Sequence, residues 1–330
     1  MKKNIAVIGC GHWGKNLVRN FNDLGRLSAI CDPDSSIAKK YADQYSVDDL
    51  PFKEILKNPK INGVVLAVPA HLHAPMAIQA MEACKNVYVE KPLAMTQSEA
   101  ISMIDCSKKM DVKLMVGHLL QYHPIFTATK HLCNSGELGK IQYVYSNRLS
   151  CGKIRTEEDV IWSFAPHDIS MILSLIDEKL KYVRAESANI TQKKIADKAT
   201  IYMEFISGLK THISVSWLNP VKEQKLVVIG DSATLIFDDT KSWKEKLVIY
   251  RHQFGKGKIK NEIVKGEAEY ITIPESEPLS NECKHFVDVV DGKLLPKTDG
   301  AEGLNVLKVL TAASSSIKID SRVEMESNGK

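Results

Sequence analysis

The feature that most constrains this chain is a glycine-rich turn near its N-terminus. Gly9-Cys10-Gly11-His12-Trp13-Gly14 has the spacing G-x-G-x-x-G, and it stands between the apolar run Asn4–Ile8 and a helical pattern of apolar residues. In that context the first glycine permits a tight turn, Gly11 lets the backbone approach a ligand, and Gly14 allows close packing of helix on strand. We therefore predict a strand, turn and helix whose N-terminal N–H groups face the phosphates of a dinucleotide.

A carboxylate at the end of the next predicted strand narrows the choice of dinucleotide. Asp32 directly follows the apolar run Leu27–Cys31. A carboxylate there accepts hydrogen bonds from an adenosine ribose and repels a 2′-phosphate. The sequence thus predicts NAD as the cofactor and favours it over NADP, with His12 and Trp13 of the turn also in contact with it.

The first 120 residues alternate short apolar runs with helical patterns, which predicts a parallel sheet with right-handed crossovers. The predicted strands are Asn4–Ile8, Leu27–Cys31, Gly63–Val68, Asn86–Val89 and Lys113–Val116. Thr96-Gln97-Ser98-Glu99 is a capping box, which marks the start of a helix. We expect residues 1–120 to form an NAD-binding Rossmann domain, and the α/β class for the chain.

After about residue 120 the pattern changes to long β-rich runs. The predicted strands are Ile141–Asn147, Thr200–Ile206, Thr211–Trp217, Lys225–Ile229, Ala233–Phe237 and Lys246–Tyr250, with helices after Pro166, near Leu279–Val290 and over Ala301–Ile317. Runs of strands with few helices favour an α+β domain. A length of 330 residues also fits two domains, so we expect residues 121–330 to form a second, substrate-binding domain with a large, mainly antiparallel sheet.

Composition excludes several classes of partner. The chain has 44 basic and 40 acidic residues, a formal charge of +4, which is too small to indicate a nucleic-acid partner. No apolar run approaches the length of about 18 residues that spans a bilayer. The seven cysteines are odd in number and have no CxxC spacing, as expected in a reducing cytoplasm. The basic stretch Arg251 to Lys265 has few aromatic residues and predicts an exposed hairpin.

Polar residues follow the third and fourth predicted strands at the carboxyl edge, where open parallel sheets bind ligands. After the third strand come Val68, Pro69, His71 and His73, which we expect to contact the cofactor. The two histidines have no further zinc ligands at a familiar spacing, so no metal site is predicted.

Glu90-Lys91-Pro92 closes the fourth predicted strand and delivers Lys91 to the same edge. The positive ring of bound NAD+ lowers the pKa of a neighbouring ammonium, so Lys91 is a candidate to take an alcohol proton or to hold the alkoxide. A salt bridge at the strand end is the alternative. The Lys91-Pro92 bond is a candidate for the cis form, which occurs mainly before proline.

The second domain contributes a histidine. In Trp162-Ser163-Phe164-Ala165-Pro166-His167-Asp168, we expect Pro166 near the first position of a helix and Asp168 in its first turn. His167 titrates near neutrality and is a candidate proton acceptor; a capping or packing role is the alternative. Just upstream, the cationic and amide groups of Asn147, Arg148, Lys153 and Arg155 are candidates to bind a pyrophosphate, or else form a solvated loop.

Taken together, these segments resemble the Gfo/Idh/MocA oxidoreductases over nearly the whole length. The resemblance rests on the Gly9–Gly14 turn, Pro69 and His73, Glu90-Lys91-Pro92, Gly117-His118, Tyr122-His123-Pro124, Gly136-x-x-Gly139-Lys140-Ile141 and Pro166-His167-Asp168. It implies catalytic roles for Lys91 and His167, cofactor contacts by Glu90 and Gln121, and substrate contacts by His118, Arg148, Arg155, Trp162 and Asp168. Many members carry Asp where this chain has Ser163, so the proton transfer is expected to rest on Lys91 and His167.

Within the family, the segment from Gly11 to Phe21 together with Trp162-Ser163-x-Ala165-Pro166-His167-Asp168 resembles the bacterial nucleotide-sugar 3-dehydrogenases. This resemblance implies hydride transfer from C3 of a sugar such as UDP-N-acetylglucosamine to NAD, giving a 3-keto sugar for surface polysaccharide or lipid A biosynthesis. It also implies a homodimer or homotetramer assembled through the open C-terminal sheet. A free aldose or inositol dehydrogenase is one alternative, and an NAD-binding regulator without activity is another.

Overall fold

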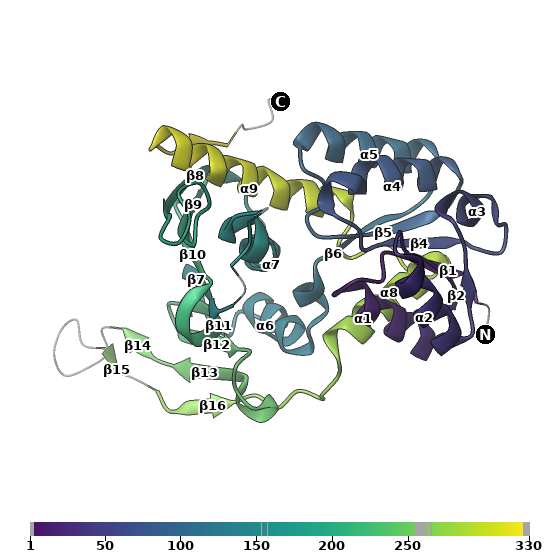
Figure 1. Ribbon diagram of the computed structural model, residues 1–330. Coiled ribbons are helices and arrows are strands. Elements are labelled where there is room, and N and C mark those ends of the chain that lie inside the picture. Colours follow the sequence, from purple (N-terminus) through teal and green to yellow (C-terminus); the bar gives the residue numbers. More distant parts are fainter. Residues whose placement is uncertain (1–2, 153, 157, 255–262, 265, 326–330) are drawn as a thin grey trace. The chain divides into compact units, whose positions relative to one another are not determined.

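The computed structural model describes residues 3–152, 154–156, 158–254, 263–264 and 266–325 (Figure 1). The chain divides into two compact units. Unit 1 comprises residues 1–122 and 276–307, and unit 2 comprises residues 123–275 and 308–330. This differs from the expected division at residue 120, because a C-terminal segment joins the N-terminal unit.

Unit 1 is built on a six-stranded, fully parallel sheet. In sheet order its strands are β3 (Asp48–Asp49), β2 (Leu27–Cys31), β1 (Ile5–Ile8), β4 (Gly63–Leu66), β5 (Asn86–Glu90) and β6 (Leu114–Gly117). The order 3-2-1-4-5-6 is that of a Rossmann dinucleotide-binding fold, as predicted. All five predicted strands are present within two residues of their expected ends, and β3 is an addition that the sequence did not indicate.

Helices cover both faces of this sheet (Figure 1). They are α1 (Gly14–Asp23), α2 (Ser35–Tyr45), α3 (Phe52–Lys57), α4 (His73–Glu82), α5 (Gln97–Lys109) and α8 (Pro278–Val290), with 3-10 turns η1 (Ala70–Leu72) and η2 (Leu119–Tyr122). The predicted capping box is present at α5, where Thr96 Oγ1 accepts from Glu99 N and the Glu99 carboxylate accepts from Thr96 N. The boundary of this helix is therefore set by local sequence.

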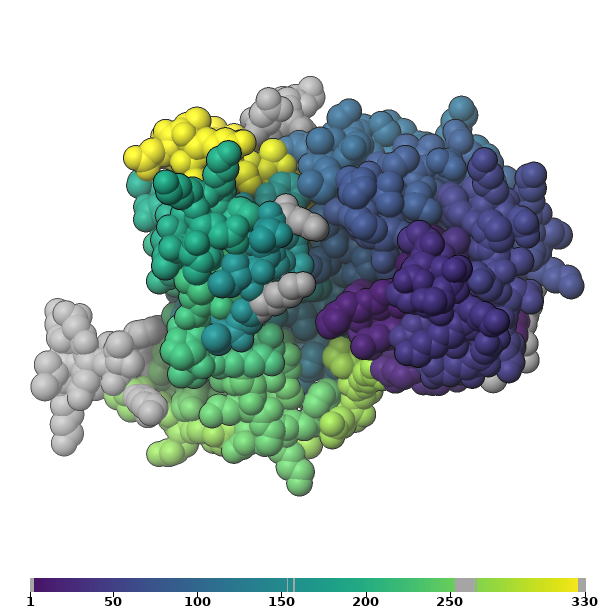
Figure 2. Space-filling model, in the orientation of Figure 1, coloured from purple at the N-terminus to yellow at the C-terminus, as the bar shows by residue number. Residues whose placement is uncertain are grey.

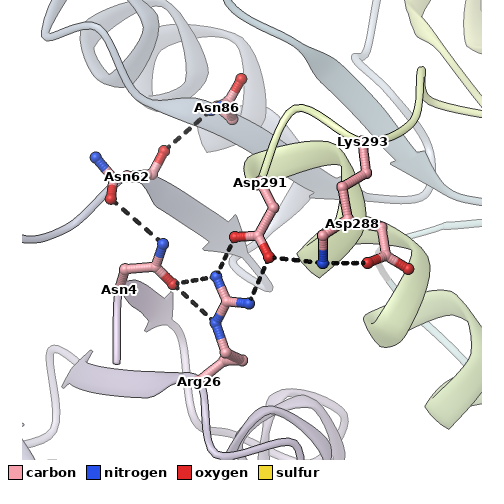
Figure 3. Close-up of polar contacts among 7 residues, drawn as sticks. All are labelled: Asn4, Arg26, Asn62, Asn86, Asp288, Asp291 and Lys293. Carbon is pink, nitrogen blue, oxygen red and sulfur yellow. Dashed lines mark hydrogen bonds and ion pairs between the residues drawn. The ribbon is translucent and has the colours of Figure 1, made fainter. Parts of the chain in front are cut away.

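Helix α8 joins unit 1 because its apolar face completes the core under the sheet. The Phe286 ring lies 6.1 Å from the Phe21 ring and 5.7 Å from the Tyr88 ring, between centroids. At the C-terminal end of α8, Asp291 accepts two hydrogen bonds from the Arg26 guanidinium, at 2.9 and 2.5 Å (Figure 3). Arg26 in turn donates to Asn4 Oδ1, which ties the segment to the start of β1.

Unit 2 is built on a nine-stranded mixed sheet in which only β7 and β10 pair in parallel. In order the strands are β16 (Ala268–Tyr270), β13 (Leu247–Arg251), β12 (Ala233–Asp238), β11 (Leu218–Gly230), β7 (Ile141–Cys151), β10 (Lys210–Ser216), β9 (Lys198–Phe205), β8 (Leu180–Ala188) and β17 (Val323–Glu324). The expected mainly antiparallel sheet is confirmed, while β8, β16 and β17 were not predicted. A separate pair, β14 (Gln253–Phe254) and β15 (Ile263–Val264), flanks residues 255–262, so most of the predicted hairpin lies outside the described residues.

The helices of unit 2 are α6 (Pro124–Asn134), α7 (Val160–Leu175), the 3-10 turn η3 (Trp243–Glu245) and the end of α9 (Gly300–Ile319). Figure 2 shows the yellow end of α9 packed against the teal side chains of the sheet, where Ser316 Oγ accepts from Ala185 N at 2.9 Å. Among the described residues, no helix is both long and apolar enough to cross a membrane.

Helix α7 begins earlier than predicted. Its N-cap is Asp159, whose carboxylate accepts from Ile161 N and Trp162 N, and Pro166 lies inside the helix. The expected first-turn positions of Pro166 and Asp168 are therefore wrong. The Asp cap supplies the start signal, and proline only removes one donor from a helix that is already formed.

Candidate active site

The glycine-rich turn has the geometry that a dinucleotide requires. A Cβ on Gly9, whose φ is +88°, would lie 2.5 Å from Ala67 O, and a Cβ on Gly14 would lie 1.9 Å from Gly9 O. At Gly11 a Cβ would meet no heavy atom of the described residues within 4 Å. The first and third glycines are thus required by packing of the protein on itself. The middle one faces open space, as it must if a pyrophosphate approaches the backbone there.

The N-terminus of α1 and the end of β2 complete this half of the site. Within the described chain, no side chain caps α1 and its first turn carries no acidic residue, so no side chain of that turn neutralises its positive end. His12 and Trp13 are exposed. Asp32 accepts from Cys10 N at 2.6 Å and from Asp34 N at 2.9 Å, which fixes its half-buried carboxylate beside the turn. These residues fit the dinucleotide that the sequence predicts.

The cofactor-contact residues predicted in the loop after β4 differ in exposure. His71 and Pro69 are exposed and Val68 is half-buried, so all three remain candidates for cofactor contact. His73 is 1% exposed, and its Nδ1 and Nε2 lie 2.8 Å from Pro92 O and 2.9 Å from Val68 O. Both of its ring nitrogens therefore face backbone carbonyls, and burial lowers its pKa. His73 ties two loops together and is not placed to contact a cofactor.

The end of β5 stands next to the glycine-rich turn. Trp13 Nε1 donates to Glu90 Oε1 at 2.7 Å, and Tyr88 Oη donates to the same oxygen at 3.0 Å. Glu90 is buried, and its carboxylate accepts hydrogen bonds from the protein itself. This differs from the predicted cofactor contact. Lys91, the next residue, is half-buried, and the Lys91-Pro92 peptide is cis. The bond from Trp13 thus places Lys91 beside the turn.

The segment after β6 is more buried than a substrate contact would be. His118 is 1% exposed, and its Nδ1 lies 2.5 Å from Glu302 Oε2. Gln121 is 3% exposed, and its carbonyl accepts from the Lys297 ammonium. Packing of this segment against the C-terminal residues of unit 1 accounts for the difference from the predicted substrate and cofactor contacts.

In unit 2, the His167 region is organised around a buried ion pair. Asp168 is 1% exposed and accepts from Arg148 Nε at 2.5 Å and from the Ser146 hydroxyl. Because Asp168 is adjacent to His167, Arg148 holds this part of α7 on β7. His167 itself is half-buried, and Ser163 is buried one turn before it. Arg148 and Asp168 therefore position His167, which differs from the direct substrate contacts predicted for them.

The remaining predicted substrate residues are less closely grouped. Trp162 is half-buried, and its Nε1 donates to Ser314 Oγ at 3.0 Å. Arg155 is exposed and pairs with Glu158. Asn147 alternates with the helix-facing Ser146 and donates to Glu223, and Lys153 lies outside the described residues. The structure thus does not bring Asn147 and Arg148 to one face of the sheet.

One buried acidic residue, Glu282 of α8, was not singled out from the sequence. Glu282 is 1% exposed and lies among the buried Leu279, Cys283 and Phe286. A charged residue at helical spacing within an apolar stripe was the available signal.

Comparison with known proteins agrees with this geometry. Residues 3–118 match the oxidoreductase family GFO_IDH_MocA, NAD-binding Rossmann fold, and residues 126–236 match the GFO/IDH/MocA C-terminal domain. UDP-N-acetylglucosamine 3-dehydrogenase of Acidithiobacillus ferrooxidans is 25% identical over 306 residues, 92% of this chain and 93% of its own length. The scyllo-inositol 2-dehydrogenase (NAD(+)) of Bacillus subtilis is 25% identical over 248 residues, 70% of this chain and 72% of its own. The uncharacterized oxidoreductase YrbE of Bacillus subtilis is 26% identical over 224 residues, 63% of this chain and 66% of its own.

Solved structures share the fold along the whole chain. The Acidithiobacillus ferrooxidans UDP-N-acetylglucosamine 3-dehydrogenase GnnA has a TM-score of 0.84 at 21% identity, covering 96% of this chain and 98% of its own. WlbA dehydrogenase from Bordetella pertussis, solved with NADH and UDP-GlcNAcA, has a TM-score of 0.80 at 20% identity, covering 99% of both chains. With both domains matched and the dinucleotide turn in place, the chain belongs to the Gfo/Idh/MocA family of NAD-binding oxidoreductases.

Proposed function

We propose that this protein is an NAD-dependent dehydrogenase of a nucleotide sugar, which it oxidises at C3 to a 3-keto sugar. The observation that carries the proposal is the Trp13–Glu90 hydrogen bond of 2.7 Å, because it holds Lys91 beside the dinucleotide turn. The alignment over 92% of this chain with a UDP-N-acetylglucosamine 3-dehydrogenase supports that substrate class. Its 3-keto product would serve surface polysaccharide or lipid A synthesis in the cytoplasm.

The residues of unit 1 would hold the cofactor. The open backbone at Gly11 and the N-terminus of α1 suit a pyrophosphate, and Asp32 suits an unphosphorylated ribose. When bound, NAD+ supplies the acceptor for a hydride and its electron pair. NAD is favoured over NADP because the Asp32 carboxylate would repel a 2′-phosphate.

Lys91 and His167 would manage the proton. As the C3 carbon loses hydride, its hydroxyl oxygen loses a proton and becomes a carbonyl oxygen. The amine of Lys91 in unit 1 and the imidazole of His167 in unit 2 are the two candidates to take that proton. The Arg148–Asp168 ion pair, which lies beside His167 on α7, supports this role for His167.

A free inositol or aldose is the second candidate substrate. Arg148 and Arg155, two of the cations expected to bind the pyrophosphate, are paired with Asp168 and Glu158 within the protein. The relationship to scyllo-inositol 2-dehydrogenase over 70% of the chain points the same way. A regulator that binds NAD without turnover is the third reading.

Absorbance of reduced nicotinamide tests these readings together. Purified protein and NAD+ are mixed with UDP-N-acetylglucosamine, with free inositols and with free aldoses, alongside Lys91→Ala. Turnover of the nucleotide sugar, lost in the variant, is the expected result. Turnover of only a free polyol or aldose would transfer the proposal to the second candidate, and NAD binding without turnover would leave the regulator.

We also propose that unit 2 assembles into a homodimer or homotetramer through the sheet face that carries Tyr143, Tyr145, Tyr202 and His212. Tyr145 stacks on His212 with ring centroids 5.2 Å apart, and Tyr202 is 41% exposed. Aromatic residues of this kind are enriched at subunit interfaces. Light scattering of wild type and Tyr202→Glu is the test, and an unchanged mass would contradict this assignment.

A further inference from the structure

A buried carboxylate in unit 2 lies outside every site predicted from the sequence. Asp197, which directly precedes β9, is 0% exposed. Its Oδ2 accepts from Ile190 N and Thr191 N, both at 2.7 Å, and its Oδ1 accepts from Thr191 Oγ1 at 2.7 Å and Trp217 Nε1 at 2.6 Å. Burial by itself would raise the pKa of Asp197, but these hydrogen bonds outweigh it and lower the pKa to about 2. Asp197 is therefore an ionised group held by four uncharged donors.

Three of these hydrogen bonds come from the loop of residues 189–196, which joins β8 to β9. The loop contains no helix or strand, and the side chain of Ile190 is 65% exposed. A segment that buries little apolar surface opens easily unless hydrogen bonds hold it. The shape of this loop thus depends on the Asp197 carboxylate, to which Ile190 and Thr191 donate.

The chain that leads from β7 into α7 is attached to both partners of Asp197. Gly152 N donates to Trp217 O at 3.1 Å, and Gln192 Nε2 of the loop donates to Arg155 O at 2.9 Å. Arg155 is one of the cations that the sequence predicts for substrate binding. Its backbone is therefore held by the loop that Asp197 fixes.

Helix α7 depends on the same loop at its first turn. Pro166 inside the helix has no N–H, so the Trp162 carbonyl four residues earlier has no helical donor. Val160 N, at the first helical position, has no acceptor within the helix and donates to Ala196 O at 3.1 Å. Because Ala196 directly precedes Asp197, the start of α7 is bonded to the fixed end of the loop.

The Trp217 ring supports the second turn of α7. Trp217 is 1% exposed, and its ring lies edge-on to the Phe164 ring with centroids 6.3 Å apart and an interplanar angle of 88°. The bond from Trp217 Nε1 to Asp197 fixes the orientation of that ring. Residues three positions apart are neighbours on a helix surface, so the ring contact lies one turn before His167.

We propose that Asp197 is a positioning residue for α7: its carboxylate fixes Trp217 and the loop of residues 189–196, which together hold the first turns of α7 and thereby place His167. This inference rests on the proposed function only for the task that His167 performs. The attachment of α7 to the loop is a property of unit 2 alone.

Two variants remove one donor each. Thr191→Val removes the hydroxyl of an exposed residue and keeps its backbone N–H, and Thr191→Ser restores the hydroxyl as the matched control. Trp217→Phe removes the indole N–H together with part of the ring. Its matched control is Trp243→Phe, which loses a similar bond of 2.7 Å to Ile273 O elsewhere in unit 2.

Hydrogen exchange read by mass spectrometry tests the attachment. A hydrogen bond to a charged group is worth about 10-fold or more, so Thr191→Val and Trp217→Phe should speed exchange by about 10-fold in peptides covering residues 189–196. Peptides covering residues 158–165, at the start of α7, should speed up by at least about threefold. Thr191→Ser and Trp243→Phe should match the wild type in both regions. Unchanged exchange over residues 158–165 in both test variants would overturn the proposal.

NMR and kinetics test the placement of His167. The imidazole signals of His167, assigned by their loss in His167→Gln, should shift in Thr191→Val and Trp217→Phe and stay in place in Thr191→Ser. With a sugar that the wild type oxidises, kcat/KM should fall by about 10-fold in the two test variants, because misplacing a proton-handling group costs rate. NAD affinity should stay within about twofold, since the glycine-rich turn belongs to unit 1. Thermal unfolding confirms that each variant is folded at the assay temperature.

Failure of this inference is distinguishable from failure of the proposed function. Faster exchange with unmoved His167 signals would reduce Asp197 to a structural role and overturn the proposal, even if the sugar is oxidised as proposed. If no sugar is oxidised, the proposed function fails, and the exchange and NMR results still decide the role of Asp197.

Discussion

Removing the carboxylate of Asp291 should loosen the C-terminal segment from unit 1 in a pH-dependent way. The Arg26 guanidinium, whose side chain is 8% exposed, holds both oxygens of Asp291 (Figure 3). Arg26, and to a smaller extent the Lys293 ammonium, lower the pKa of that carboxyl from 3.8 to about 2. At about 1.36 kcal/mol per pKa unit, a pKa lowered from 3.8 to about 2 corresponds to roughly 2 kcal/mol of stabilisation. We expect Asp291→Asn to cost about 2 to 3 kcal/mol at pH 7.

The sign of the pH dependence follows from the depressed pKa. The stabilisation is fully present above the unfolded-state pKa near 4 and is lost as the pH falls through about 2. The wild type should therefore approach the variant in stability between pH 4 and pH 2. The two should differ by a constant amount between pH 5 and pH 7.

Urea unfolding with pulsed hydrogen exchange measures this in unit 1 specifically, through peptides of α8 and β1. Asp288→Asn is the matched control, because it removes the other carboxylate that contacts Lys293, whose side chain is 62% exposed, and leaves the Arg26–Asp291 pair in place. Such an exposed pair should contribute about 0.5 kcal/mol or less. A loss below about 0.5 kcal/mol in Asp291→Asn at pH 7, or a difference that persists unchanged at pH 2, would refute the reasoning.

Three further outcomes follow from the same geometry. Gly14→Ala should unfold or severely destabilise unit 1, since its Cβ would lie 1.9 Å from a backbone oxygen. Gly11→Ala should fold normally and bind NAD at least about 10-fold more weakly. Thermal unfolding measures the first effect, and NAD titration measures the second. Asp32→Asn keeps the acceptors but removes the charge, so the ratio of NAD to NADP affinity, measured by competition, should fall. Asp168→Asn leaves Arg148 without its full countercharge and should cost about 3 kcal/mol of stability and most of the turnover, read by unfolding and initial rates. An Asp168→Asn protein as stable and active as the wild type would contradict a positioning role for this pair.

Sequence was a sufficient guide where the determining interactions are local. The glycine-rich turn, the strands of the parallel sheet and the capping box at Thr96 depend on residues within a few positions of one another. The cis bond at Lys91-Pro92 was also anticipated, because proline is the residue before which that form is common. Asp32 could likewise be placed at the end of its strand, because it directly follows the apolar run that forms β2.

Prediction failed where a residue's partner is remote in the chain. The sequence predicts a cofactor contact for His73, but its Nδ1 lies against Pro92 O. It predicts a substrate contact for His118, but its Nδ1 lies against the Glu302 carboxylate. The start of α7 was misplaced because Pro166 gave a stronger apparent start signal than the Asp159 cap seven residues earlier. In each case the local pattern was compatible with two environments.

The dinucleotide turn and the parallel sheet can be predicted from the chain's local patterns, which also name Lys91 and His167 as candidate proton-handling groups, because hydrophobic period, turn chemistry and strand ends depend on neighbouring residues. The packing of α8 into the core of unit 1, which buries Glu282, follows from the fold and could not be predicted in this way. The segments around Glu90 and Glu282 are about 190 residues apart in the chain. Because burial and charge pairing depend on such distant segments, a local pattern does not predict which carboxyl groups are buried.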